Sequence, residues 1–412
     1  MVSHMTQIIS DDNEIGKIID QLTTTIQSNG GYLHPDITIQ CQKKQLSLHT
    51  KNGMAINGYA IIIPHACLMP IDEFQWGLDD SDDITIQSAS PKVTPLQREI
   101  TDLVVELFNR TDKITQFRQT CLDLKATRNY KLIETMYSAR PMDLEDFKKK
   151  QNKNEQEVLL EGLFQTRYYY LFKSPETTIQ DRERVIIPII DLMNHHIKGE
   201  ITLNSVLQAE TANDCPPYLC IKCSPVPGSD ECCHNYGVRD AYELFVGYQY
   251  IDRNADFLRS VPLTVDLGDT GSMEIFSNIT DPGYPRHTLP PELVDLHFFI
   301  PPLNVTESGV IQLGYIYIPG QHAPYSMRRV LALSLQQLNS SLSPQQLERK
   351  VLMTERQILR KNLDFFYNLK RLVQGTSPCP EDAYFFKLVN ELADMLINRI
   401  QNYRFFKEAM QE

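Results

Sequence analysis

The N-terminal part of the chain changes from a helical to a strand-like spacing of hydrophobic positions. Isoleucine and leucine recur three and four residues apart over 15–26, and the pattern stops at Asn29-Gly30-Gly31. The period then falls to two at 37–39 and 46–48, and an apolar run at 60–63 ends at a proline. We therefore predict one amphipathic helix followed by short strands that are joined by tight turns.

The chain becomes helical near residue 94. The segment Thr94–Gln97 reads Thr-Pro-Leu-Gln, which is the signature of a capping box with proline at the first helical position. Hydrophobic residues then recur at helical spacing as far as Phe108, and a second helix is predicted over Val158–Leu171. Tyr169 lies on this second helix. Between the two helices, Lys148–Lys150 stand beside acidic residues, which favours a solvated helix face over a binding patch.

Strand-like patterns return from Val185 to Leu267, and the last third of the chain is helical again. The proline-rich stretches Asp281–Pro285 and Leu289–Pro291 form the predicted linker. The long periodic segments after it are Met327–Leu338, Gln345–Val373 and Asp382–Met410. We therefore expect a β-rich part over 1–93, a helical insert over 94–165, a second β-rich part over 166–270 and a helical C-terminal domain over 271–412.

The composition is compatible with an ordinary soluble enzyme. Hydrophobic residues make up 42% of the 412 residues and charged residues 22%, so that a sizeable core can form. No apolar run approaches the roughly 18–20 residues that cross a bilayer, and no secretory signal opens the chain. The nine cysteines are odd in number and scattered, as expected for free thiols in the cytoplasm.

The net charge of −12 limits the partners that the chain can have. Binding to nucleic acid through phosphate neutralisation is disfavoured, because acidic residues are spread along the whole sequence. A basic protein or peptide partner is electrostatically permitted. We expect a monomer that binds neither nucleic acid nor a membrane.

Two segments combine side chains that can carry chemistry. The segment 187–195 reads Ile-Pro-Ile-Ile-Asp-Leu-Met-Asn-His, which places carboxylate, amide and imidazole groups at the end of a buried run. About forty residues later, 234–237 reads His-Asn-Tyr-Gly, in which the glycine permits a sharp turn that could bring a phenol to the same place.

Together, and in this order, these segments resemble the SET-domain protein methyltransferases. They resemble in particular the branch that contains the Rubisco large-subunit lysine methyltransferase and the actin histidine methyltransferase. Segment 184–195 is similar to the family's Pro-x-x-Asp-x-x-Asn-His strand, and 236–250 is similar to its element Tyr-Gly…Ser-Asn-Ala-Glu-Leu…Tyr-Gly-Phe. The resemblance covers most of the chain, but its motifs are specific only over 185–263.

The resemblance implies an α+β fold. In this family a helical insert splits a SET-type β-rich fold, and an all-helical C-terminal domain then receives a protein substrate. It also implies S-adenosylmethionine as the cofactor and N-methylation of a protein side chain as the reaction. That reaction needs a neutral nucleophile aligned with the methyl group.

The resemblance also assigns residues. Asn194 and His195 would hold the cofactor through amide and backbone hydrogen bonds. Tyr236 would be the catalytic phenol beside the methyl group, and Tyr248 a second phenol that lines the amine channel. Tyr250 stands where the family has an aromatic side chain that packs on adenine.

Arg167, from the end of the insert, would line the substrate or cofactor cleft. Arg239, after the Tyr-Gly turn, would contact the substrate. Lysine is the preferred target, because Tyr248 suits a narrow channel for an aliphatic amine. Histidine methylation is the alternative within the enzyme class. Tyr169 and Ile190 occupy the positions of histidine-pocket residues, although neither supplies an amide to orient an imidazole.

Three departures from the family pattern leave a non-enzymatic alternative open. The cofactor loop of the family carries Gly-x-Gly, where this chain has Gln45-Leu46-Ser47, so that Ser47 is the candidate contact there. Asp240-Ala241 replaces the family's Ser-Asn, and Gln249 stands in place of glycine after Tyr248. A SET-like module that binds proteins without catalysis would also fit these changes.

The remaining alternatives are structural or metal-binding. Asn194 could simply cap a turn, and a buried tyrosine usually only satisfies its hydroxyl. Cys220, Cys223 and the Cys232-Cys233-His234 run have the density of a zinc site, but the alternation around Cys220 favours a strand. No metal is therefore expected.

The residue usage suits an AT-rich microbial genome, and a bacterial protein delivered into a host cell is one of several interpretations.

Overall fold

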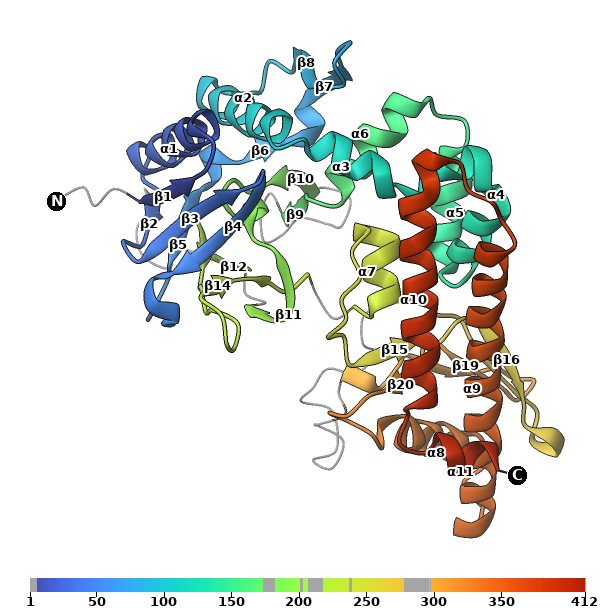
Figure 1. The fold of residues 1–412 in the computed structure, drawn as a ribbon. Helices are drawn as coiled ribbons and strands as arrows, with labels where there is room; N and C mark the ends of the chain where they lie inside the picture. Colours follow the sequence, from blue (N-terminus) through green and yellow to red (C-terminus); the bar gives the residue numbers. More distant parts are fainter. Residues whose placement is uncertain are drawn as a thin grey trace. The chain divides into compact units, whose positions relative to one another are not determined.

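The computed structural model describes residues 6–172, 182–200, 203–206, 218–236, 239–277, 296 and 298–411. Helices and antiparallel-rich sheets alternate along the chain, which confirms the predicted α+β class (Figure 1). The chain divides into two compact units. Unit 1 comprises residues 1–118 and 154–238, and unit 2 comprises 119–153 and 239–412. The helical insert expected over 94–165 is thus shared between the two units.

The first helix of unit 1 forms where the hydrophobic spacing predicts it. Helix α1 (Asn13–Ser28) begins after Asp12, whose carboxylate accepts hydrogen bonds from the backbone N–H groups of Glu14 and Ile15. Its buried face includes Ile15, Ile19 and Leu22. The helix ends just before Gly30, which has a φ of +91°.

Three sheets and a hairpin contain the strands of the described part of unit 1, apart from β11. The first sheet has the order β1-β3-β4-β14, and its partners β3 and β4 are the predicted strands near 37 and 46. The second has the order β12-β13-β5-β2, and the third has the order β6-β10-β9. Strands β7 and β8 form the hairpin, and the exposed acidic residues Asp79, Asp80 and Asp82 lie at its tip. The bounds are β1 (Gln7–Ser10), β2 (Tyr32–Leu33), β3 (Ile37–Gln42), β4 (Gln45–Thr50), β5 (Ile61–Pro64), β6 (Met69–Pro70), β7 (Phe74–Leu78), β8 (Ile84–Ala89), β9 (Tyr169–Phe172), β10 (Arg182–Ile186), β11 (His195–Glu200), β12 (Leu203–Val206), β13 (Tyr218–Ile221) and β14 (Glu231–Cys232).

One pairing in the first sheet crosses a long sequence separation. Strand β14 pairs antiparallel with β4, so that Cys232 lies opposite Leu48 and Glu231 opposite His49. This pairing brings the segment that leads to Tyr236 next to the N-terminal strands.

The helices between residues 95 and 165 confirm the predicted capping box. Thr94 accepts a hydrogen bond from the backbone N–H of Gln97, and the Gln97 side chain accepts one from the backbone N–H of Thr94. The helices are α2 (Pro95–Arg110), α3 (Lys113–Thr120), α4 (Leu122–Ser138), α5 (Pro141–Lys150) and α6 (Glu155–Gln165). Lys148 and Lys149 are exposed on α5, as expected for a solvated face.

The helix predicted over Val158–Leu171 is wrong at its C-terminal end. Helix α6 stops at Gln165, and residues from Tyr169 onward form β9, in which Tyr170 pairs with Arg184 of β10. Consecutive tyrosines have a strong preference for strands, and an available strand partner outweighs the weak helical pattern of the sequence here.

Unit 2 combines long helices with strands. Helices α9 and α10 pack side by side, and α8 also packs against α9 (Figure 1). The helices of this unit after residue 240 are α7 (Ala241–Tyr248), α8 (Ser326–Leu338), α9 (Pro344–Gln374), α10 (Ala383–Gln401) and α11 (Phe406–Met410). They follow the predicted periodic segments, except that residues 402–405 separate α10 from α11.

The expectation of an all-helical C-terminal domain over 271–412 holds only from Ser326 onward. Strands occupy much of the described chain before that residue, in the sheets β16-β17-β19-β18 and β15-β20. Their bounds are β15 (Phe257–Arg259), β16 (Leu263–Asp266), β17 (Ser272–Ile275), β18 (Leu303–Val305), β19 (Val310–Leu313) and β20 (Tyr317–Pro319). Strand β19 alternates half-exposed and buried positions after Gly309, whose φ of +79° makes the turn, and so short a pattern is easily missed.

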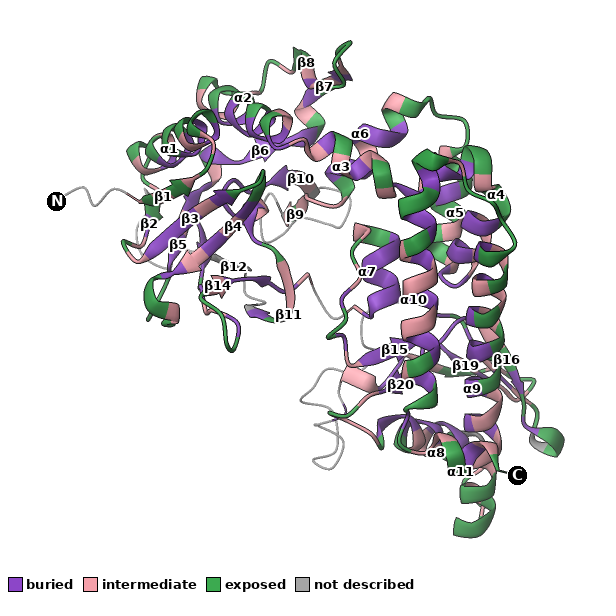
Figure 2. Cartoon of the chain, in the orientation of Figure 1, coloured by how far each residue is buried: buried purple, intermediate pink, exposed green. Residues whose placement is uncertain are grey.

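Burial follows the predicted periodicity in both units (Figure 2). Helix α9 buries Ile358, Leu359 and Phe366, while the residues on its opposite face are exposed. No helix in the part of the chain that the structure describes is long and apolar enough to cross a membrane. The predicted linker at Asp281–Pro285 and Leu289–Pro291 lies outside the described residues.

Candidate functional site

The segment that ends in Asn194-His195 makes an unusual turn after β10. Ile189 has a φ of +71° and is fully buried, although a β-branched side chain strongly disfavours this conformation. Such strain persists only where the surrounding packing determines the backbone, and it is enriched at functional sites. The turn leads into a short 3₁₀ helix, Ile190–Leu192, in which Ile190 is buried. The predicted substrate contact Ile190 is therefore part of the core of unit 1.

Asp191 is held by Arg167. The Nη1 group of Arg167 lies 2.9 and 3.0 Å from the two carboxylate oxygens, and the Asp191 side chain is only 6% exposed. The guanidinium also lies over the ring of Phe108, 5.1 Å from its centroid. Its buried Nε has no hydrogen-bond partner among the described residues.

A second cation stands near this ion pair. Burial, together with the charge of Arg167, lowers the pKa of Lys113 from 10.5 to about 8, while Asp191 opposes the shift. Two basic groups and one carboxylate therefore interact electrostatically in this part of unit 1. Their combined charge can accept an additional anionic group.

Asn194 joins three segments of unit 1. Its side-chain Nδ2 donates to the carboxylate of Glu231 at 2.7 Å and to the backbone oxygen of Leu46 at 3.4 Å. Its own backbone oxygen accepts a hydrogen bond from the N–H of His234 at 2.8 Å. The next residue, His195, forms a parallel β-bridge with His234.

Tyr236 lies against this strand. Its backbone N–H donates to Nδ1 of His195 at 3.2 Å, and its hydroxyl donates to the backbone oxygen of Met193 at 3.3 Å. The ring centroids of Tyr236 and His195 are 4.9 Å apart. The ring of His234 lies 5.8 Å from Tyr236 and 5.9 Å from Tyr169. The phenol of the Asn-Tyr-Gly bend and the end of the Asp-x-x-Asn-His segment are thus in direct contact.

Gly199 permits this close approach. A Cβ atom at this position would lie 2.5 Å from the backbone oxygen of Cys233, far inside normal contact. Only glycine therefore lets β11 run so near the residues that precede Tyr236.

Ser47 stands on β4, in the strand region expected to replace the family's glycine loop. Its Oγ lies 2.9 Å from Nε2 of His49, and Nδ1 of His49 lies 3.1 Å from the carboxylate of Asp230. The hydrogen bond with His49 lowers the pKa of Asp230. Strand β14 pairs with β4 only at Leu48 and His49. The backbone of residues 45–47 is therefore not paired with β14.

The cysteine-rich stretch has a structural role in the described chain. Cys220, Cys223, Cys232 and Cys233 are all buried. The thiols of Cys223 and Cys232 are hydrogen-bonded to one another, an arrangement that raises the pKa of Cys232 together with burial. Among the described residues, no group of three or more histidine, cysteine or acidic side chains is arranged to hold a metal.

The other predicted site residues belong to unit 2. The guanidinium of Arg239 lies over the ring of Tyr248, 5.2 Å from its centroid, and Tyr250 is 45% exposed. Gln249, which replaces the family's glycine, adopts the left-handed conformation with a φ of +59°. It retains this conformation with the help of a 2.8 Å hydrogen bond that its side chain accepts from Thr120.

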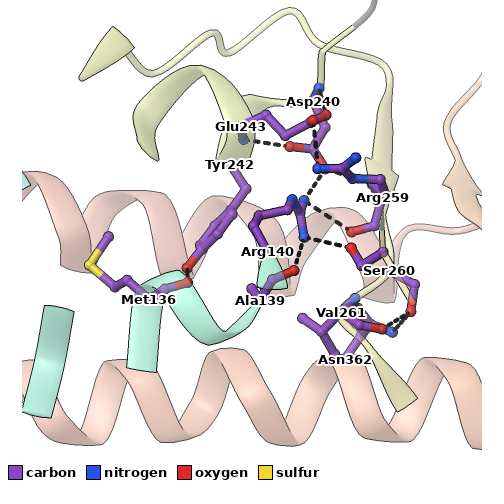
Figure 3. A network of polar contacts seen from close by, with 11 residues as sticks. Met136, Ala139, Arg140, Asp240, Tyr242, Glu243, Arg259, Ser260, Val261 and Asn362 are labelled. Carbon is purple, nitrogen blue, oxygen red and sulfur yellow. Dashed lines mark hydrogen bonds and ion pairs between the residues drawn. The ribbon is translucent and has the colours of Figure 1, made fainter. Parts of the chain in front are cut away.

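A buried ionic network fixes the start of α7, the helix that ends in Tyr248 (Figure 3). Arg140 donates from Nη2 to the carboxylate of Asp240 at 2.8 Å, and Asp240 also accepts from the backbone N–H of Arg259 at 2.6 Å. The side chain of Arg259 pairs with Glu243 at 2.7 Å. All four side chains are at most 5% exposed. Burial and the charge of Asp240 raise the pKa of Glu243.

The network also includes neutral groups. The Tyr242 hydroxyl donates to the backbone oxygen of Met136 at 2.6 Å. Asn362 of α9 donates to the hydroxyl of Ser260 and accepts from the backbone N–H of Val261. The network therefore joins α4, α7, β15 and α9 within unit 2 (Figure 3).

Sequence reasoning missed several of these partners. Glu231, which binds the Asn194 side chain, follows a stretch with no recognisable motif. The spacing of Asp240 and Glu243, in contrast, is that of a capping box, and both of its hydrogen bonds form. This signal could have placed the start of α7. Nothing in the sequence pointed to Arg140 or Lys113.

Comparisons with known proteins give only distant likenesses. No family model and no curated protein matches the chain. Among solved structures, the chain is similar to the SET domain of LSMT bound to lysine and AdoHcy, with 14% identity, a TM-score of 0.38, and coverage of 96% of this chain and 95% of that one. It is also similar to Rubisco LSMT bound to AdoMet, with 12% identity, a TM-score of 0.36 and coverage of 96% and 97%. Because these scores are low, no residue here takes its role from those structures.

The substitution Gly199→Ala tests the close approach of β11 to Cys233. The added methyl group must push the two backbones apart, and we expect a loss of about 1–3 kcal/mol in the free energy of unfolding. Gly247→Ala is the matched control, because a Cβ there meets nothing within 4 Å. Equal effects of the two changes in urea unfolding would contradict the role given to Gly199.

The substitution Lys113→Met tests the crowding of positive charge. Since the folded-state pKa of about 8 lies below the ordinary value of 10.5, the charged lysine destabilises the fold below pH 8, and this cost disappears as the pH rises towards 10.5. We expect Lys113→Met to raise the stability by about 1–3 kcal/mol at pH 7 and by much less at pH 10. The melting temperature at the two pH values, with exposed Lys92→Met as the control, checks this. A gain that does not depend on pH would contradict the explanation.

The substitution Arg140→Met tests the buried network. It leaves two buried carboxylates with one arginine, and we expect a cost of about 3–5 kcal/mol in unfolding free energy. Adding Asp240→Asn should recover part of this loss, because it removes the uncompensated charge. Exposed Lys131→Met on α4 serves as the control. A cost no larger than that of the control would show that the network contributes nothing.

Proposed function

We propose that this chain is an S-adenosylmethionine-dependent protein N-methyltransferase of the SET type that acts on a lysine side chain. One observation carries the proposal. The Tyr236 phenol contacts Met193 and His195 in the same unit as the Asn194 amide. This contact between the two motif segments that resemble the family supports a single site built from both.

The residues present fit the proposed cofactor. S-adenosylmethionine, when bound, supplies an electrophilic methyl group on a sulfonium, and it also carries an amino-acid carboxylate. The excess positive charge of Arg167 and Lys113, with the unsatisfied Nε of Arg167, suits such a carboxylate. Asn194 supplies an amide, and the backbone of 45–47 and Ser47 supply polar groups beside it.

The protein itself must keep the substrate amine neutral and orient it. A lysine amine has a pKa of about 10.4 in water, so that the site must favour its neutral form. Burial near a positive charge does this, and Lys113 shows the effect within unit 1 itself. The Tyr236 hydroxyl would orient the neutral amine and exclude water from it. Tyr248, Arg239 and Tyr250 belong to unit 2, and the roles that the sequence assigns to them in amine and substrate binding stay predictions.

Lysine is favoured over histidine as the target. A histidine substrate needs a side chain that orients its ring, and Ile190, at the corresponding position, is a buried aliphatic residue. Tyr169 offers a ring but no amide. The substrate would be a protein, and unit 2 would supply the surface that receives it. We propose a cytoplasmic monomer as the working form.

Cofactor binding is the first test of the proposal. S-adenosylhomocysteine at millimolar concentration should raise the melting temperature of the protein, because a ligand that binds only the folded state stabilises it. Asn194→Ala should remove most of this shift. An unchanged melting temperature in the wild-type protein would instead support the non-catalytic binding module.

The role of Tyr236 is tested separately from binding. Tyr236→Phe should reduce methylation of lysate proteins by tritium-labelled S-adenosylmethionine about a hundredfold, since it removes only the group that orients the nucleophile. Cofactor affinity should stay nearly intact. Tyr59→Phe, an exposed tyrosine of the same unit, is the matched control. Equal loss of activity and affinity would show that the role of Tyr236 is misassigned.

A further inference from the structure

The charge of the chain is divided unevenly between its two units. Unit 1 contains 15 lysines and arginines and 27 acidic residues, whereas unit 2 contains 25 of each. The net charge of −12 thus belongs to unit 1, and unit 2 is neutral. Within unit 2, α9 departs from this balance, with seven basic and three acidic residues. A basic surface on an acidic protein requires an explanation.

Three basic residues of α9 have partners within unit 2. Lys350 donates to the backbone oxygen of Leu267 at 3.0 Å, and Arg356 donates to that of Ala409 at 2.6 Å. Lys370 forms an ion pair with Asp394 of α10. These side chains fasten α9 to neighbouring elements.

The other basic residues of α9 point away from those elements. Arg349, Arg360 and Arg371 are exposed, and none has a carboxylate within 4 Å in the described chain. Each lies eleven positions from the next. At 100° per residue they fall within about 40° of one another on the helix, roughly 16 Å apart along its axis. Exposed Tyr367 lies on the same line, and we call Arg349, Arg360, Tyr367 and Arg371 the arginine face.

An ordinary solvated helix would balance these charges with acidic residues three or four positions away. On the arginine face the acidic residue is Asp364, which forms no ion pair within 4 Å in the part of the chain described. Lys361, also exposed, adds to the positive charge. Asp364 lies four positions after Arg360 and offsets part of the charge, and the face keeps a net positive charge over about 33 Å of helix.

We propose that the arginine face is a docking surface for an acidic face of a partner protein. Guanidinium groups match carboxylates in a two-pronged geometry, and arginine and tyrosine are enriched at protein interfaces. A regular spacing of about 16 Å selects a partner with carboxylates spread along an extended or helical segment. The inference is independent of methyl transfer, because it concerns binding alone.

Two other occupants are separated from this one by charge density or by the test. A nucleic acid carries about one charge per 1.7 Å of duplex axis, a density that arginines about 16 Å apart do not match. A second copy of the chain would present its acidic unit 1 to the arginine face, and the oligomeric state of the wild-type chain distinguishes this case.

The test uses the full chain and a fluorescent poly-glutamate peptide as the probe. Binding, followed by anisotropy at low salt, should weaken at least about tenfold in the triple variant R349E/R360E/R371E, because each attraction becomes a repulsion. It should also fall steeply with added salt. R349Q/R360Q/R371Q should show a smaller loss, and thermal melting establishes that both variants fold. The control K51E/K92E/K222E changes exposed residues of unit 1 by the same total charge and should alter affinity less than about twofold.

Four outcomes would overturn the proposal. The first is the absence of peptide binding at about 100 µM wild-type protein. The second is an equal loss in the control, which would indicate a general charge effect. The third is a labelled oligothymidylate that binds as tightly as poly-glutamate and is equally weakened by the triple variant. The fourth is sedimentation that reveals a dimer of the wild-type chain which the triple variant abolishes.

Discussion

The candidate site of unit 1 depends on the contact between two backbone segments. The N–H of His234 donates to the carbonyl of Asn194, and the adjoining β-bridge fixes His195 beside His234. These links set the distance between the Asn194 amide and the Tyr236 phenol. Gly199 permits the close approach of β11 to Cys233. The pairing of β14 with β4 orients the segment that leads to Tyr236. Without this contact, the two motifs would be isolated side chains.

Local patterns in the sequence predicted much of the fold. The spacing of hydrophobic residues located α1 and α9, and the Thr94–Gln97 capping box marked the start of α2. These features depend on residues within a few positions of one another, so that they are visible in the sequence. The strand that begins at Tyr169 was missed because its identity depends on pairing with β10, which is remote in the chain.

The same distinction applies to the candidate site. Asn194, His195 and Tyr236 could be selected because each belongs to a recognisable segment. Glu231 and Arg140 could not, because their importance comes only from what the fold places beside them. In unit 2, buried charges are paired in the network around Asp240, while those of the arginine face are exposed and form no ion pair with any residue that the structure describes. Pairing offsets the large desolvation cost of a buried charge, whereas an exposed charge is solvated by water and stays available to a binding partner.

The central claim is that Asn194, His195 and Tyr236 surround one binding site for the methyl donor. The most direct measurement is ultraviolet cross-linking of S-adenosylmethionine with a labelled methyl group, followed by mass spectrometry of the peptides. The account predicts that the label appears in peptides from 190–196 or 231–236, and that excess S-adenosylhomocysteine prevents it. Label that falls only in other peptides, or that the competitor does not prevent, would contradict the account.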